Sequence, residues 1–137
     1  MPPHDAAMHP SQALLEPDER AHGDLPVCDH YAGVEDRMRK ALGLQHELGP
    51  VFDVTLDNED GAPVGGETDH ALLIQSLLCS PLNHFGRVGV RILPVDHPKF
   101  DDVLAISVGG TTKPAYVMLP KPVGVADVQR CAAALDA

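Results

Sequence analysis

The stretch Val51-Phe52-Asp53-Val54-Thr55-Leu56 and the acidic segment after it, Asp57-Asn58-Glu59-Asp60-Gly61, decide how this sequence should fold. The first part is rich in β-branched and aromatic residues, which favour a β-strand. It runs directly into three carboxylates within four residues, and Pro63 and Gly65-Gly66 end the loop. This pattern predicts a strand whose carboxyl end carries a cluster of polar groups.

Outward from this strand, short apolar runs alternate with longer amphipathic ones, which predicts βαβ units and a parallel sheet. We expect four strands, at residues 25–28, 51–56, 88–92 and 115–119. Helices should follow from about residues 33 and 67, at about residues 100–106, and along an apolar stripe made by Val125, Val128, Ala132 and Leu135. We therefore predict an α/β domain of four βα units at residues 24–137, preceded by a loosely ordered, proline-rich arm at residues 1–23.

Four parallel βα units fit two architectures. One is a small doubly wound sheet, and the other is the first half of a TIM (β/α)8 barrel, which needs about 250 residues. The length of 137 residues favours the doubly wound sheet, whereas the residues at the strand ends favour the half-barrel. We predict the half-barrel, a parallel (βα)4 unit.

The charge balance excludes several classes of partner. Ten basic residues stand against twenty acidic ones, and the net charge of -10 repels nucleic acid and anionic membrane surfaces. No apolar run approaches the roughly 18 residues of a membrane span, and no secretory signal is visible. Three widely spaced cysteines suggest neither a disulfide framework nor a metal knuckle. We expect a cytoplasmic protein with no nucleic-acid or membrane partner.

Both architectures place ligands at the carboxyl ends of the strands, so the candidate site residues are those that follow each strand. These are Asp29 and His30 after the first strand, Asp57, Glu59 and Asp60 after the second, Arg91 near the end of the third, and Lys121 after the fourth.

Each candidate has a structural and a functional interpretation. The acidic segment is either a solvated turn or a set of carboxylates balanced by a cation. Arg91 interrupts an apolar strand, so it either forms a structural ion pair with a carboxylate of the second strand or binds a substrate carboxylate through two hydrogen bonds of its planar guanidinium, and it can do both. His30 is a surface residue or a base, and Lys121, between two prolines, pairs with an acid or is catalytic.

Three strand-end motifs in order resemble the HpcH/HpaI aldolase and citrate lyase β-subunit family. They are residues 52–63, which cover the end of the second strand and the acidic segment, residues 87–92 in the third strand, and residues 116–121 at the end of the fourth. The resemblance covers roughly residues 24–137. Asp60 stands where the aldolase branch of the family has a histidine, which points to the citrate lyase-like branch.

The resemblance implies a Mg²⁺-dependent (β/α)8 barrel that cleaves or forms carbon–carbon bonds in hydroxy acids or their coenzyme A thioesters. It implies that Arg91 binds the substrate's carboxylate or carbonyl oxygen, that Glu59 and Asp60 are catalytic and lie near the metal and its waters, and that Asp57 supports them. With His30, Arg91 and Asp57 are also the expected substrate-binding residues. The direct Mg²⁺ ligands of the family are expected beyond residue 137, so we expect no metal ligand within this chain.

Two other interpretations stay open. The chain can be an inactive truncated remnant of the family that keeps its strand-end residues by descent. It can also be a phospho-receiver-like signalling domain. In that case Glu59-Asp60 would be the acidic pair, Asp96 the acceptor of the phosphoryl group, and Lys121-Pro122 the Lys-Pro pair that such domains carry. If the chain is a half-barrel, pairing of two copies would cover its open sheet edges, so we expect a homo-oligomer.

Overall fold

The structure, a computed structural model, describes residues 26–137, and the predicted arm at residues 1–23 lies outside this range. Four strands form one sheet: β1 (Asp29–Ala32), β2 (Asp53–Asp57), β3 (Val88–Arg91) and β4 (Val117–Met118). Every neighbouring pair is parallel, and the order across the sheet is β1-β2-β3-β4. A doubly wound sheet would place β1 between two later strands, whereas consecutive order is that of a barrel wall. The chain therefore has the fold of the first half of a TIM barrel, as the strand ends predicted.

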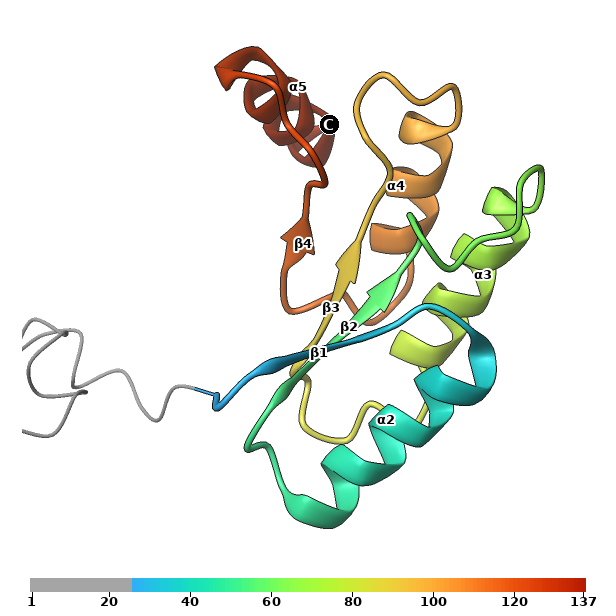
Figure 1. Ribbon diagram of the computed structural model, residues 1–137, viewed down its shortest axis with the longest axis vertical. Coiled ribbons are helices and arrows are strands. Elements are labelled where there is room, and N and C mark those ends of the chain that lie inside the picture. The colour runs from blue at the N-terminus through green and yellow to red at the C-terminus, as the bar shows by residue number, and fades with distance from the viewer. Residues whose placement is uncertain (1–25) are drawn as a thin grey trace, which may run out of the picture.

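Four helices alternate with the strands: α2 (Glu35–Leu48), α3 (Glu67–Leu78), α4 (Phe100–Val108) and α5 (Val125–Asp136). Figure 1 shows α2, α3 and α4 on the same side of the sheet, as expected for the outside of a barrel. Helix α2 begins with two acidic residues, which suit the positive end of the helix dipole, and it ends at Gly49, whose φ of 86° favours glycine. Within residues 26–137, no helix combines the length and the apolar character needed to cross a membrane.

The core lies between the sheet and these three helices. Because side chains alternate along a strand, every second strand residue points towards the helices. The buried strand residues of this face pack against Met38 and Leu42 of α2, Ile74 of α3 and Phe100 of α4; they are Ala32, Val54, Leu56, Val88 and Val90. The other strand residues, which include Tyr31, Thr55, Asp57 and Arg91, therefore share the opposite, inner face.

The first strand is not where the sequence predicted it. It covers Asp29–Ala32 rather than residues 25–28, and Val27 of the predicted strand is 80% exposed. The prediction followed an apolar run, but Asp29 and Tyr31 on the inner face of the real strand bind other polar side chains instead of entering an apolar core. Asp29 and His30 consequently lie within the strand and do not follow it.

Two smaller expectations also need correction. Strand β4 is only two residues long, Val117–Met118, instead of spanning residues 115–119. The predicted apolar stripe of α5 is largely exposed at Val125, Val128 and Leu135, and the buried residue of this helix is Cys131. Helix α5 lies beside α4 and has no neighbour on its other side within the described residues, which leaves the stripe uncovered.

Candidate active site at the carboxyl ends of the strands

Arg91 and Asp57 form the centre of the site. They are register partners at the ends of the neighbouring strands β3 and β2, so the parallel ladder itself brings them together. Arg91 donates from Nε to Asp57 Oδ1 at 2.9 Å and from Nη2 to Oδ2 at 2.6 Å, a bidentate ion pair. The predicted structural pairing of Arg91 with a carboxylate of the second strand is confirmed.

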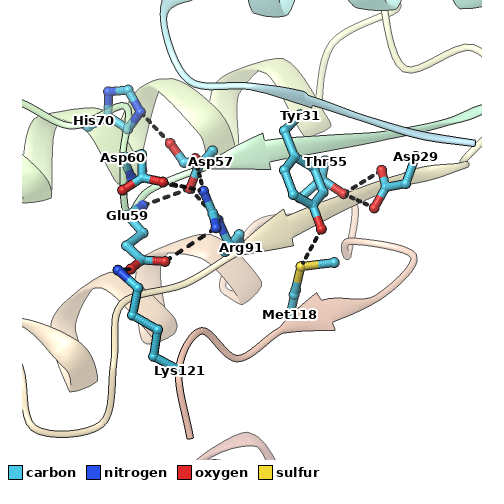
Figure 2. A network of polar contacts seen from close by, with 10 residues as sticks. All are labelled: Asp29, Tyr31, Thr55, Asp57, Glu59, Asp60, His70, Arg91, Met118 and Lys121. Atoms are coloured by element: carbon cyan, nitrogen blue, oxygen red, sulfur yellow. Dashed lines mark hydrogen bonds and ion pairs between the residues drawn. The ribbon is translucent and has the colours of Figure 1, made fainter.

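Two further carboxylates of the acidic segment turn to the same arginine, as Figure 2 shows. Asp60 Oδ2 accepts a hydrogen bond from Nη2 at 2.8 Å, and Glu59 Oε2 lies 3.4 Å from Nη1. Lys121 reaches Glu59 from the loop after β4, with Nζ 2.5 Å from Oε1. The predicted pairing of Lys121 with an acid is thus confirmed. Three carboxylates at the end of β2 thus meet two cations, one at the end of β3 and one after β4, which leaves the cluster one negative charge in excess.

The acidic segment is not the solvated turn that composition alone would predict. The Asp57 and Glu59 side chains are only 5% and 8% exposed, and only the Asp60 side chain, at 68%, faces solvent. Carboxylates are rarely buried without a partner, and here the partners come from residues distant in sequence.

The ion pairs shift the acidity of both central groups. Burial of Asp57 raises its pKa, but the hydrogen bond from Arg91 and the main-chain N–H groups of Glu59 and Asp60 outweigh that effect, so the pKa lies below the ordinary value. The hydrogen bonds to Asp57 raise the pKa of Arg91. The hydrogen bond to Glu59 likewise raises the pKa of Lys121. Asp57, Arg91 and Lys121 are therefore charged at neutral pH.

Contacts from other elements hold the main chain of the acidic loop. The Asn58 N–H donates to the Arg91 carbonyl at 2.9 Å and its side chain donates to Ser107 of α4 at 3.3 Å. The buried His70 of α3 donates from Nε2 to the Asp57 carbonyl at 2.9 Å. These bonds satisfy buried polar groups and fix the direction in which the loop carboxylates leave the strand.

The end of the loop is fixed by a close approach between two glycines. Gly33, just after β1, and Gly61 lie with their backbones in contact, and a Cβ on Gly61 would overlap the backbone of Gly33. Only a residue without a side chain fits there, so the loops after β1 and β2 can be adjacent.

A second cluster of polar side chains lies on the inner face of the sheet, and it is made by Asp29, Thr55 and Tyr116. Thr55 donates to Asp29 at 2.7 Å, and its hydroxyl lies 2.7 Å from the Tyr116 hydroxyl. Burial raises the pKa of Tyr116 to about 12, helped by the nearby Asp29 carboxylate. Tyr31 donates to Met118 Sδ at 3.0 Å, and its ring lies under the Arg91 guanidinium, 5.1 Å from ring centre to Cζ.

The structure brings together most of the residues that the sequence proposed, but not all of them. Asp57, Glu59, Asp60, Arg91 and Lys121 form one cluster. His30 does not join it, because it alternates with Asp29 and Tyr31 and points to the helix side of β1, where it lines a small apolar pocket with Cys28 and Phe52. The position assigned to His30, after the first strand, was wrong.

The phospho-receiver interpretation loses its basis. It requires a doubly wound sheet, which the strand order contradicts. Asp96 is exposed in a turn after β3, and Lys121 is paired with Glu59.

Several residues of the site were missed from the sequence. Tyr31 and Thr55 share the inner face with Asp57 and Arg91. Strand alternation in the correctly predicted second strand already indicates Thr55, whereas Tyr31 would have been found only had the first strand been placed correctly. His70 and Tyr116 gave no such signal, because a helix and a loop bring them to the sheet.

The described residues do not supply a complete metal site. Within residues 26–137, no three His, Cys, Asp or Glu side chains come together in a way that could hold a metal ion. Figure 2 shows the carboxylates of Asp57, Glu59 and Asp60 turned to the cationic groups of Arg91 and Lys121, which lie where these acids meet.

Comparison with known proteins agrees with this geometry. A scan against models of protein families found no match, and a search of curated proteins found none. Among solved structures, the chain is similar to a citrate lyase from Burkholderia xenovorans LB400, with a TM-score of 0.77 and 52% sequence identity. The similarity covers 82% of this chain and 36% of that one, so the chain spans about a third of the length of the enzyme it matches. With the fold, the order of the strand-end motifs and this identity in agreement, we conclude that the chain belongs to the citrate lyase (HpcH/HpaI) family.

Proposed function

We propose that this chain forms part of the active site of a carbon–carbon lyase that cleaves a hydroxy acid, or its coenzyme A thioester, by retro-aldol or retro-Claisen chemistry. The observation that carries the proposal is the placement of Arg91 at the carboxyl end of β3, held rigidly by Asp57 and next to the buried Glu59. Mg²⁺, coenzyme A and a cytoplasmic location belong to the proposal through the family resemblance alone.

The chemistry needs two groups that this cluster can supply. In retro-aldol cleavage the substrate hydroxyl gives up its proton and becomes a carbonyl. The carbon–carbon bond breaks, and its electron pair passes to the other fragment as an enolate, which is then protonated. A fixed cation near the oxygen that gains charge stabilises the transition state more than the ground state, and an acceptor near the hydroxyl takes its proton.

Arg91 and Glu59 suit these two roles. Arg91 keeps its positive charge and is oriented before any ligand arrives, so little reorganisation is needed when it binds an anionic oxygen. Glu59 Oε2 is buried and accepts no hydrogen bond from the described residues, while Oε1 is held by Lys121. A buried acceptor without a donor suits a substrate hydroxyl. Asp57 orients Arg91, and we place Asp60 at the rim of the same site.

The second candidate is a non-catalytic member of the family. It is favoured by the pairing of the loop carboxylates with Arg91 and Lys121, which directs these acids to cations of the chain itself. Such a protein would bind an anionic acid at Arg91 without turning it over. Binding and turnover therefore have to be measured separately.

The test of the binding site compares citrate with tricarballylate, which is citrate without its hydroxyl. Calorimetric titrations in metal-free buffer use the wild type, R91K and E59Q, with R130K as the matched control because Arg130 forms an exposed ion pair with Asp101 away from the site. We expect R91K to weaken both ligands at least about 10-fold, since lysine lacks the two-pronged geometry. E59Q should reduce the preference for citrate over tricarballylate, and R130K should change neither affinity.

Turnover is tested by adding Mg²⁺ and following oxaloacetate release from citrate, and from its coenzyme A thioester, in a coupled malate dehydrogenase assay. Cleavage that R91K abolishes supports the lyase. Binding without cleavage supports the non-catalytic candidate for the chain alone. Citrate binding that R91K leaves unchanged would overturn the assignment of Arg91 in both candidates.

A further inference from the structure

The guanidinium of Arg91 has two edges that can each bind a carboxylate, and the structure uses them unequally. Asp57 fills the edge formed by Nε and Nη2, with contacts of 2.9 and 2.6 Å. On the other edge, Nη2 contacts Asp60 at 2.8 Å, but Nη1 is 3.4 Å from Glu59, beyond ordinary hydrogen-bond length. The second edge therefore lacks a bidentate partner.

The two aspartates differ in how firmly they are held. Asp57 is buried, and its Oδ1 also accepts the main-chain N–H groups of Glu59 at 2.9 Å and Asp60 at 3.4 Å, so its displacement would leave buried donors unpaired. The Asp60 side chain is 68% exposed, and its contact with Arg91 is the only polar contact of its carboxylate among the described residues. Water can replace that contact at little cost, as for other exposed ion pairs.

We propose that Asp60 is a placeholder on the Nη1–Nη2 edge of Arg91, and that the carboxylate of an incoming hydroxy acid displaces it to gain a bidentate contact there. The proposal deepens the proposed function and rests on it, because it requires Arg91 to be the anion-binding group. Displacement exchanges one carboxylate for another on Nη2 and adds a hydrogen bond on Nη1. It also suggests how a loop with three acidic residues can admit an acid, since Asp60, of the two carboxylates near this edge, is the exposed one that can move into solvent.

Competition of this kind has a measurable signature. If Asp60 covers the edge most of the time, only a fraction of the molecules can bind the ligand. Removal of Asp60 makes all of them open, so binding should tighten by the inverse of that fraction. For an exposed ion pair this factor is about 5, and the loss of one negative charge at the rim acts in the same direction. A residue with a structural role would instead lower both affinity and stability when replaced.

The experiment titrates citrate into the metal-free chain and compares D60N with D101N. Asp101 is the matched control, because it is also an exposed aspartate paired with an arginine, but its ion pair with Arg130 joins α4 to α5, away from Arg91. We expect D60N to bind citrate about 5-fold more tightly than the wild type, D101N to bind it equally, and both variants to melt within a few degrees of the wild type. In NMR spectra of D60N, the Arg91 Nε–H signal should keep the position set by its bond to Asp57.

The outcomes separate this proposal from the one on which it rests. Unchanged or weaker citrate binding by D60N, while R91K abolishes binding, overturns the placeholder and leaves Arg91 as the anion-binding group. Equal binding by R91K and the wild type, or no binding by the wild type and D60N alike, overturns both. Citrate binding by D60N but not by the wild type supports the placeholder, because it means that Asp60 blocks the edge in nearly all wild-type molecules.

Discussion

At the scale of single residues, Asp57 shows how the fold can bury a charge and still keep it ionised. The ladder between β2 and β3 places Arg91 opposite it, and two main-chain N–H groups of its own loop complete its contacts. Removing either partner of a buried pair leaves the other charge uncompensated, which typically costs about 3–5 kcal/mol. Because the Arg91 side chain is 17% exposed, we expect its loss to cost about the lower figure.

The stability that Asp57 contributes should depend on pH. Its pKa in the folded chain lies below the ordinary value of 3.8, so the contribution is complete above about pH 4 and is lost as the pH falls through the folded-state pKa. We expect the difference in unfolding free energy between the wild type and D57N to be constant from pH 6 to 5 and to shrink below pH 4. Urea titrations at each pH measure it, with D102N, a change at an exposed aspartate of α4, as the control. A difference that does not change with pH would contradict the assignment.

Tyr116 should titrate abnormally. Burial raises its pKa to about 12, above the ordinary value of 10.0, so its contribution to stability is present below pH 10 and lost as the pH rises towards 12. The chain has two tyrosines, so Y31F leaves Tyr116 as the only one. We expect the absorbance of Y31F at 295 nm to rise near pH 12 in the folded chain and near pH 10 in urea, with circular dichroism to follow the fold. A folded-state midpoint near 10 would show that Tyr116 is solvated.

At the scale of secondary-structure elements, the site depends on how closely the loops after β1 and β2 approach each other. Gly33 and Gly61 make that approach possible, and Gly89 of β3 does the same for the ring of Tyr116. These glycines are needed for space, since none of the three has a positive φ. The elements that surround the site are thus positioned by the absence of side chains as well as by their contacts.

Substitution of Gly61 tests this packing. G61A should force the two loops apart and lower the unfolding free energy by about 1–3 kcal/mol, as overpacking does elsewhere. Gly43 is the control, because it lies in the middle of α2 on the side that faces solvent. No atom lies within 4 Å of a Cβ added there. G43A should raise stability by about 0.5–1 kcal/mol. Urea unfolding compares the two, and equal effects would mean that the loops are not in contact in solution.

Residues that end or interrupt an apolar run could be predicted from the sequence, and contacts that depend on helix packing could not. The acidic strand end, Arg91 and Lys121 were predicted because each interrupts or ends a recognisable apolar run. Strand β1 was misplaced because its inner face is polar, and a polar strand does not show the apolar alternation on which the prediction relied. The pairing of Arg91 with Asp57 required only the strand register, whereas the supports from His70 and Ser107 depend on helix packing that no local pattern encodes.

At the scale of the whole molecule, the described part of the chain is an open wall of four strands. Strands β1 and β4 lie at its edges, and within residues 26–137 each pairs on one side only. The stripe of α5 made by Val125, Val128 and Leu135 is also uncovered. Exposed strand edges and apolar helix faces favour association with another polypeptide surface.

We therefore expect the isolated chain to self-associate. Sedimentation equilibrium at tens of micromolar should give a mass of at least about twice the 14.6 kDa of one copy. V128E, which places a charge on the α5 stripe, should reduce that mass, whereas L44E on the exposed part of α2 is the control. A mass of 14.6 kDa together with a cooperative melt would count against self-association.

The polar inner face limits what can pack against that side of the sheet. Asp29, Thr55, Tyr116 and Arg91 leave it without an apolar surface on which a layer of helices could settle. Apolar side chains laid over these groups would take them out of water without offering hydrogen bonds in return. The same wall therefore separates an apolar interface with helices on one face from a surface suited to water and small polar ligands on the other.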